Sequence, residues 1–233
     1  TGAALPFSLG RRAEGQSWAL DSASARKLTQ RSAKMYLVGA LLTSLAVGRF
    51  TLGLGVLQLI ALASLGGGAL ARLNVKWRLL AALGLLAAYQ LFLLSAPFTE
   101  SDNAATRINA YLSPLGLRGL ISVIPTTALV LLGSVAAQPL RDGQRATQRL
   151  LALGLGLCLG GWLTHFVTDY NKTVWSPAYI LMSAGLGTLG MLALYLLGDV
   201  LGGAWAKLLT PLTIAGRNSL FAYVVPIALK LTV

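Results

Sequence analysis

Residues 169–184 read DYNKTVWSPAYILMSA, so a cluster of polar and aromatic side chains stands directly before an apolar segment. Asn171 and Lys172 carry hydrogen-bond donors that can stabilise a developing negative charge. Trp175 offers a flat aromatic face suited to stacking on a sugar ring. We call residues 169–176 the collar and predict a binding site there. An interfacial belt of Trp, Tyr and Lys is the alternative explanation for the same residue types.

A second polar group lies in the last apolar run, where residues 216–220 read GRNSL. Ionisable and amide side chains are costly inside membrane spans, and each one is a functional candidate. The guanidinium of Arg217 matches the geometry of a phosphate and would clamp an anion, or else it reaches the lipid headgroups from a shallow position. Asn218 would contact a ligand or form a hydrogen bond to a neighbouring helix.

His165 and Asp169 are the weaker catalytic candidates. They are four residues apart, a spacing that brings two side chains together on a helix. A histidine held by a carboxylate is a general-base arrangement, and a purely structural histidine is the alternative. Gln58 and Gln90 also stand inside apolar segments, where each would line a polar cavity or form a packing hydrogen bond.

The composition is that of a membrane protein. Only 11% of the 233 residues are charged, against about 25% in soluble domains, and 55% are hydrophobic. The net charge of +12 would favour a nucleic-acid partner only on a soluble fold with a basic face, so we exclude nucleic acid. One cysteine (Cys158) and one histidine cannot build a metal site, so no metal is expected.

Apolar runs of about the length that crosses a bilayer recur along the chain. Only helices satisfy the backbone polar groups of single spans at that depth. The predicted fold class is therefore all-α: a polytopic membrane helix bundle with about seven full transmembrane helices and the end of a truncated N-terminal one. The seven runs are 35–49, 55–71, 78–96, 119–138, 149–167, 176–198 and 211–229.

The whole chain, residues 1–233, is predicted to form a single transmembrane domain. Residues 1–12 are too short to span and are interpreted as the end of a truncated helix. Residues 13–34 are basic and rich in serine, and they are predicted to form a cytoplasmic surface helix or loop. Residues 35–233 form the helix bundle, in which the last helix but one starts at Ser176-Pro177 with serine as the N-cap.

The basic residues alternate between the two sides of this topology. Thirteen fall on the side of residues 13–34 and five on the other, which predicts that the first side is cytoplasmic. The collar then faces outward. The thirteen are Arg11, Arg12, Arg26, Lys27, Arg31, Lys34, Arg72, Lys76, Arg78, Arg141, Arg145, Arg149 and Lys207; the five are Arg49, Arg107, Arg118, Lys172 and Lys230.

Four segments resemble motifs of one family, the membrane acetyltransferases typified by heparan-α-glucosaminide N-acetyltransferase. Residues 4–12 (ALPFSLGRR) look like the end of that family's second helix. Residues 55–58 (GVLQ) look like its Gly-Val-Leu-Gln-Arg helix start, and residues 171–179 (NKTVWSPAY) resemble its Asn-Lys-x-Leu-Trp signature. Residues 216–220, with Tyr223, resemble its Gly-Met-Asn helix.

The resemblance implies transfer of an acetyl group from cytosolic acetyl-CoA to a sugar or glycan on the far side of a bacterial cytoplasmic membrane. Asn171 and Lys172 would then supply donors and Trp175 a stacking face. Arg217 would meet the phosphates of CoA and Asn218 the donor inside the bundle. The catalytic histidine of the family precedes its second helix, in a loop outside this chain, and His165 does not match it.

Two other classes of function stay open at this point. A transporter would need ionisable residues near the centre of the bilayer and often an internal repeat. A membrane scaffold without chemistry would need neither. The expected partners are the lipid bilayer, acetyl-CoA and a glycan acceptor, and a homodimer is a further possibility.

Overall fold

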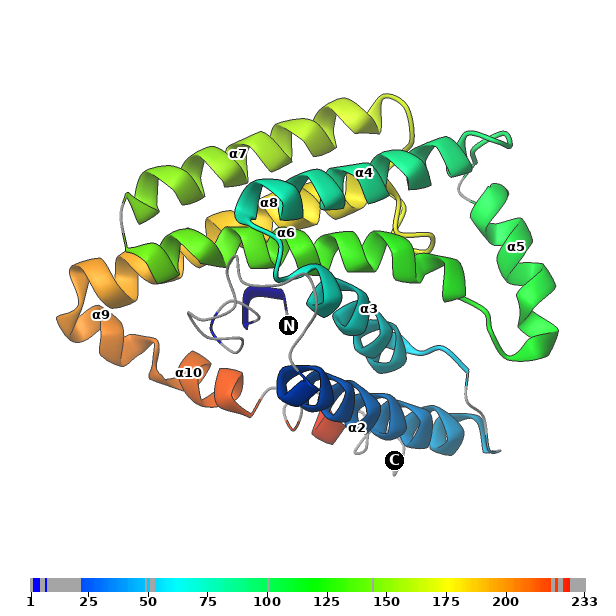
Figure 1. Ribbon diagram of the computed structural model, residues 1–233, viewed down its shortest axis with the longest axis horizontal. Coiled ribbons are helices and arrows are strands. Elements are labelled where there is room, and N and C mark those ends of the chain that lie inside the picture. The colour runs from blue at the N-terminus through cyan, green and yellow to red at the C-terminus, as the bar shows by residue number, and fades with distance from the viewer. Residues whose placement is uncertain are drawn as a thin grey trace.

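The computed structural model describes residues 2–4, 7, 22–48, 50, 53–99, 101–143, 145–218, 221 and 224–226. Helices joined by short loops make up this part of the chain, and it contains no strand, as the apolar runs predicted (Figure 1). The α-helices are α2 (Ser22–Val47), α3 (Val56–Leu70), α4 (Val75–Leu93), α5 (Ala104–Leu112), α6 (Val123–Asp142), α7 (Ala146–His165), α8 (Pro177–Tyr195), α9 (Gly203–Leu208) and α10 (Thr210–Arg217).

Short helical turns extend several of these helices. Two 3-10 turns, η3 (Ser113–Leu115) and η4 (Leu120–Ser122), connect α5 to α6, and a π-helical turn, η5 (Leu196–Leu201), prolongs α8. Another 3-10 turn, η1 (Gly2–Ala4), packs on α6, where Gly2 lies against the backbone of Val130. Most of the expected helix end at residues 1–12 falls outside the described residues.

Three helical segments are long and apolar enough to cross a membrane: Val75–Leu93, Leu120–Asp142 and Pro177–Leu201. The chain is therefore an integral membrane protein. The count of about seven spans is not confirmed. The apolar helix α3 has only 15 residues, α7 carries Arg149 and His165 near its ends, and most of the run at 211–229 lies beyond the described residues.

Helix α2 joins two stretches that the sequence analysis separated. It runs without a break from the basic segment into the first apolar run, over 26 residues. At 1.5 Å per residue it is about 39 Å long, which exceeds the roughly 30 Å of a hydrocarbon core. Its basic first turns therefore extend beyond the bilayer as part of the same helix. Strong helix formers and the absence of glycine and proline before Gly39 allow this continuity.

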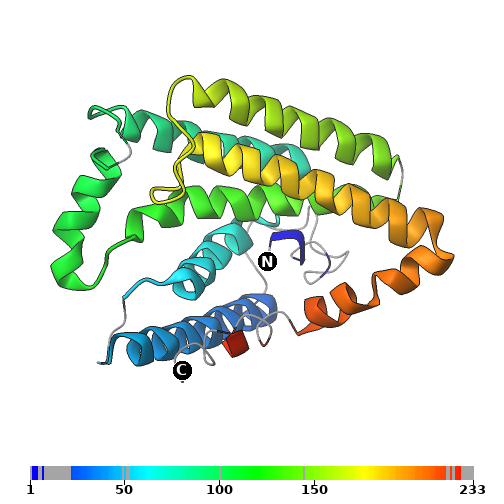
Figure 2. The ribbon, with the colours of Figure 1, turned by 180° about the vertical axis from the view of Figure 1, so that it is seen from behind.

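The connections between the helices lie at two opposite ends of the bundle. Helices α4, α6, α7 and α8 lie alongside one another, with α3 and α2 on one side (Figures 1 and 2). The ends of α4 and α7, the starts of α6 and α8, and helix α5 all meet at the end that carries the collar, which we call the collar end. The opposite end carries the loop at 71–74, the end of α6 and the start of α7, and is called the basic end.

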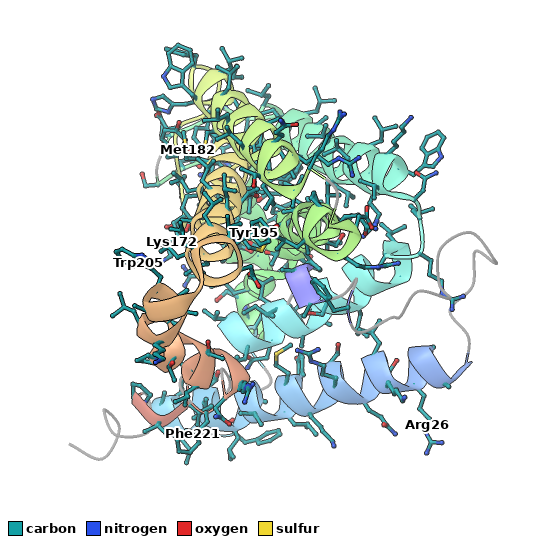
Figure 3. All side chains as sticks on the ribbon, turned by 90° about the vertical axis from the view of Figure 1, so that its left-hand side faces the viewer. Arg26, Lys172, Met182, Tyr195, Trp205 and Phe221 are labelled. Atoms are coloured by element: carbon teal, nitrogen blue, oxygen red, sulfur yellow. The ribbon has the colours of Figure 1, made fainter. Side chains whose placement is uncertain are left out.

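Helices α7 and α8 cross at glycine residues. A Cβ atom placed on Gly185 would lie 2.5 Å from Sγ and 2.6 Å from the backbone nitrogen of Cys158. One placed on Gly161 would lie 2.6 Å from the backbone nitrogen of Met182, which is labelled in Figure 3. Small residues permit this close approach of two membrane helices. Gly187 has open space around it and does not take part.

One basic residue that was counted on the cytoplasmic side is buried inside the bundle. Arg78 lies in the first turn of α4 and is 2% exposed. Its Nη1 donates to Oγ of Ser134 at 3.2 Å, and its Nη2 donates to Oε1 of Gln138 at 3.0 Å. Gln138 in turn donates to the carboxylate of Asp142 at 3.1 Å. A buried guanidinium needs such partners, so this network joins α4 to α6 at the basic end.

The α7–α8 crossing generates a stability prediction. Replacing Gly185 with Val forces the new side chain into the backbone of α7 and should destabilise the fold by about 3 kcal/mol, the upper end of the usual cost of overpacking. The melting temperature of the purified protein in detergent measures this loss. Gly187→Val is the control, because it makes the same chemical change on the same helix in open space. Equal melting temperatures for the two variants would contradict the observed crossing.

Candidate functional site

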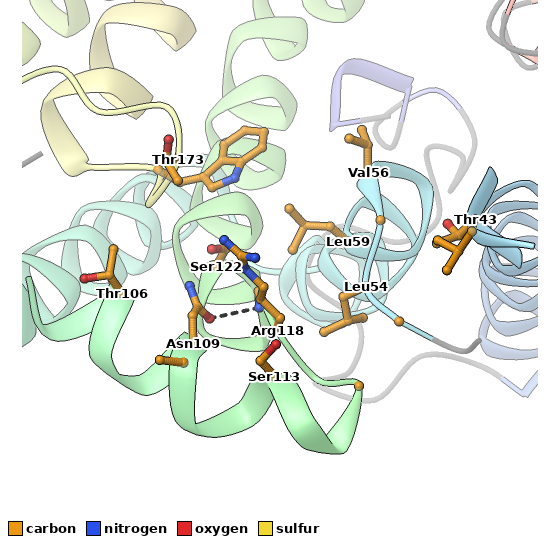
Figure 4. Close-up of a pocket in the computed structure, with 17 residues that line it drawn as sticks. Thr43, Leu54, Val56, Leu59, Thr106, Asn109, Ser113, Arg118, Ser122 and Thr173 are labelled. Carbon is orange, nitrogen blue, oxygen red and sulfur yellow. Dashed lines mark hydrogen bonds between the residues drawn. The ribbon is translucent and has the colours of Figure 1, made fainter. Parts of the chain in front are cut away.

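A cavity of about 770 Å³ opens at the collar end (Figure 4). The collar contributes Trp175 and Thr173 to its lining. The remaining walls come from the end of α2, the start of α3, helix α5 and the turns that follow α5. The polar residues that line it on the α5 side are Thr106, Asn109, Ser113, Arg118 and Ser122, and the larger apolar ones on the α3 side are Leu54, Val56 and Leu59.

Helix α5 presents a polar face to this cavity. Thr106, Asn109 and Ser113 follow one another at intervals of three and four residues, which places them on one side of a helix. The helix is fixed at its start by a capping box, in which Oδ1 of Asn103 accepts from the Thr106 backbone N–H at 3.0 Å and Oγ1 of Thr106 accepts from the Asn103 backbone N–H at 2.9 Å. The polar face is therefore held in place.

The turn after α5 is closed by a side chain of the same polar face. The backbone N–H of Gly119 donates to Oδ1 of Asn109 at 2.9 Å. Gly119 has a φ of +94°, a conformation that glycine adopts without strain. This bond folds residues 113–119 back over the cavity and places Arg118 at its edge.

Two arginines near α5 differ in their electrostatic surroundings. Arg107 forms a two-pronged ion pair with Asp102, with both N–O distances at 2.8 Å, and it holds the pKa of that carboxyl below its ordinary value. Arg107 does not line the cavity, whereas Arg118 does. The described residues that line the cavity include no carboxylate, so Arg118 gives it a positive potential.

The collar is a tightly hydrogen-bonded loop built around Asn171. This residue is buried, and its Oδ1 accepts from the backbone N–H groups of Thr173 at 2.8 Å and Val174 at 3.2 Å. A short polar side chain that satisfies the backbone two and three residues ahead is a common device for shaping a turn. Asn171 therefore forms the loop, and it is not among the described residues that line the cavity.

Ser176 closes the same loop from its other side. Its Oγ accepts from the backbone N–H of Asn171 at 3.0 Å and donates to the carbonyl of Asp169 at 2.8 Å. It also caps α8 by accepting from the backbone N–H of Tyr179 at 3.4 Å, and Pro177 occupies the first helical position. The predicted helix start, with its serine cap and proline, is confirmed.

Trp175 has a backbone conformation that is rare for a tryptophan. Its φ is +56°, in the left-handed region, and such a conformation costs about 1–3 kcal/mol and persists only where the surroundings enforce it. The hydrogen bonds of Asn171 and Ser176 hold the loop before and after Trp175. The preceding residue, Val174, is fully buried, and its carbonyl accepts from the Tyr89 hydroxyl at 2.7 Å. These contacts hold the half-buried Trp175 at the cavity wall.

The other collar candidates lie outside the cavity. Lys172 is exposed and is not part of the described lining. His165 and Asp169 do meet, as their spacing predicted, with Nδ1 and Oδ1 3.4 Å apart. The distance between Nδ1 and Oδ1 is that of an ion pair, but the two atoms do not form a hydrogen bond. The imidazole stacks on the ring of Tyr170 at a centroid distance of 4.5 Å, and neither His165 nor Asp169 lines the cavity.

Gln58 lies directly behind the wall of the cavity. It is 1% exposed, and its Nε2 donates to Oγ1 of Thr43 at 3.2 Å and to the carbonyl of Gly53 at 3.0 Å. Both of these partners line the cavity. Gln58 therefore anchors the segment before α3 to α2. Gln90 has a similar role elsewhere, since its Oε1 accepts from Oγ1 of Thr168 at 3.1 Å and connects α4 to the loop before the collar.

Arg217 and Asn218 lie apart from the collar, at the end of α10. Both are exposed, and Nδ2 of Asn218 donates to the carbonyl of Ile214 in its own helix at 3.2 Å. Asn218 borders a separate, more open hollow of about 690 Å³. Neither residue lines the collar-end cavity, so the structure does not join these candidates to Trp175. Ser219, Leu220 and Tyr223 of the same motif fall outside the described residues.

Sequence reasoning missed Asn109 and treated Arg118 as one loop charge among others. A signal for the polar face was present, because Asn103 and Thr106 have the spacing of a capping box and Thr106, Asn109 and Ser113 have a helical period. It was hidden because residues 104–112 are too few to form a spanning helix. The turn at Gly119 gave no such local signal, because it depends on a hydrogen bond to Asn109, which is ten residues earlier in the chain.

The role of Asn171 as the organiser of the loop can be tested directly. Asn171→Ala leaves two N–H groups of the collar without their acceptor and should destabilise the protein by about 1–3 kcal/mol. Asn171→Asp keeps an acceptor oxygen in place and should lose less. Thermal unfolding of the purified variants in detergent measures both values. If the Asn171→Ala variant has the same melting temperature as the wild type, the loop does not depend on this side chain.

Comparison with known protein families gives one match. Residues 2–162 match the family described as heparan-alpha-glucosaminide N-acetyltransferase, catalytic. The matched range contains α2 to α6 and most of α7, and it ends before the collar. Searches of curated proteins and of solved structures find no match. Because the match covers more than half of the chain, this protein belongs to the heparan-alpha-glucosaminide N-acetyltransferase family of membrane acetyltransferases.

Proposed function

We propose that this protein transfers an acetyl group from acetyl-CoA to an amine or hydroxyl of a sugar bound in the collar-end cavity. The observation that carries the proposal is the enforced position of Trp175 beside the polar face of α5. An aromatic ring next to several hydrogen-bonding side chains is a combination suited to sugars, because a pyranose has an apolar face and a polar edge. Thr106, Asn109 and Ser113 would meet the hydroxyls while Trp175 covers the ring.

The chemistry is an acyl transfer. The acceptor nitrogen or oxygen attacks the thioester carbon, the carbon–sulfur bond breaks, and the proton lost by the acceptor leaves with the CoA thiol. The described residues that line the cavity include no imidazole and no carboxylate. Their part is to bind and orient the acceptor, which by itself contributes a large share of an enzyme's rate enhancement.

The orientation in the membrane follows from the distribution of charge. Arg72, Lys76, Arg141, Arg145 and Arg149 belong to the basic end of the bundle or its loops. Basic residues accumulate on the cytoplasmic side of membrane proteins. We therefore place the basic end in the cytoplasm, on the side where acetyl-CoA is available, and the cavity on the extracytoplasmic side.

Substitutions at Trp175 test the proposed site. Trp175→Ala removes the ring and should reduce kcat/KM for acetyl transfer to glucosamine at least about tenfold, which corresponds to about 1.4 kcal/mol of lost transition-state stabilisation. Trp175→Gly removes the same ring and also relieves the positive φ, so it should lose as much activity as Trp175→Ala while retaining more stability. Transfer of radiolabelled acetyl from acetyl-CoA, measured in nanodiscs, gives the rates.

Trp162→Ala is the matched control, because Trp162 is exposed near the same end of the bundle and does not line the cavity. Its kcat/KM should stay within about twofold of the wild type. Wild-type turnover in both Trp175 variants would remove the collar from the mechanism and would favour a protein without chemistry at this site.

A further inference from the structure

The collar-end cavity lies at the boundary between membrane and water. Two of the membrane-crossing segments begin at Leu120 and Pro177. Arg118 and Trp175, which both line the cavity, stand two residues before these starting points. Helices long enough to cross the bilayer end near the lipid headgroups, so the two side chains are expected at that depth.

The two walls of the cavity differ in chemistry. Figure 4 shows the polar residues of α5 and its following turns on one side, and Leu54, Leu59 and Val56 on the other. The apolar wall continues to the surface, since Val56 is 48% exposed. Arg118 is flanked in the chain by Leu117, which is exposed as well. A surface of this kind at headgroup depth is apolar where it meets the acyl chains and polar where it meets water.

The charge of the cavity selects among ligands. Arg118 is a cation at its edge, and no carboxylate is present among the described lining residues. A guanidinium binds a phosphate through two parallel hydrogen bonds. An anionic ligand is therefore favoured, and its charge belongs at the depth at which membrane lipids carry their phosphates.

We infer that the acceptor is a saccharide carried on a lipid phosphate. This inference rests on the function proposed above and adds the substrate class. Arg118 holds the phosphate, Trp175 and the polar face of α5 bind the sugar, and the lipid chain leaves the cavity along the apolar wall formed by Leu54 and Val56. An acetyl group then passes from the thioester to a sugar amine, with formation of an amide and release of the CoA thiol.

Four glucosamine acceptors separate the contributions of the phosphate and of the lipid chain. Farnesyl-phosphate glucosamine has both, glucosamine 1-phosphate has the phosphate alone, octyl glucosaminide has the chain alone, and methyl glucosaminide has neither. We expect kcat/KM in nanodiscs to be highest for the first by at least about tenfold over each of the others. Equal values for all four would overturn the inference while leaving the proposed function intact.

Arg118→Gln tests the phosphate contact. The ratio of kcat/KM for farnesyl-phosphate glucosamine to that for octyl glucosaminide should fall at least about tenfold, and Arg118→Lys should restore part of it. Arg107→Gln is the control, because Arg107 is paired with Asp102 outside the cavity and its loss should leave the ratio unchanged. An Arg118→Gln protein that keeps the ratio but binds acetyl-CoA more weakly would assign Arg118 to the donor and overturn the inference.

A direct binding measurement tests the lipid-phosphate site independently of catalysis. Native mass spectrometry without acetyl-CoA measures how much farnesyl-phosphate glucosamine the wild type and Arg118→Gln retain. Retention that depends on Arg118, in a protein that transfers no acetyl group, would support the lipid-phosphate site and contradict the proposed enzyme activity. No preference for this probe over octyl glucosaminide in the wild type would contradict the site itself.

Discussion

The left-handed conformation of Trp175 is the constraint on which the site depends. Its free-energy cost is met by a loop in which the side chains of Asn171 and Ser176 form hydrogen bonds with the local backbone and in which Val174 is buried against α4. The loop places a large aromatic ring at the mouth of the bundle and starts α8 in the same few residues. One short segment thus fixes both a helix start and a side of the cavity.

The surrounding helices supply rigidity from two directions. Tyr89 connects the collar to α4 through the Val174 carbonyl, and the glycine contacts of α7 and α8 fix the helices on either side of the loop. On the opposite wall, Gln58 connects the segment before α3 to Thr43 of α2. The cavity is therefore bounded by hydrogen bonds between separate elements: the Tyr89–Val174 bond is buried, where water cannot compete for it, and those of Gln58 are partly buried.

Local chemistry made parts of this structure predictable from sequence. The helical class, the start of α8 at Ser176-Pro177 and the meeting of His165 with Asp169 all follow from rules that act within a few residues. Contacts over longer distances were not predictable. The sequence predicted Asn171 as a ligand-binding residue, and the structure adds that its Oδ1 accepts two backbone hydrogen bonds that shape the loop. Arg78 was counted only as a charge of the cytoplasmic side, and its burial depends on partners, Ser134 and Gln138, that lie on another helix.

The close fit of α7 against α8 also limits how this protein can move. With backbone atoms in contact at Gly161 and Gly185, these helices cannot slide or rotate past one another without steric collision, so they behave as one rigid unit. Helix α2 contacts α3 through side chains, since Gly39 lies against Leu57 and Gln58, and Gln58 also donates to Thr43 at the cavity wall. Side-chain contacts rearrange without forcing one backbone past another, so any widening of the cavity that admits or releases substrates is expected to separate α2 from α3 and to break the bond between Gln58 and Thr43.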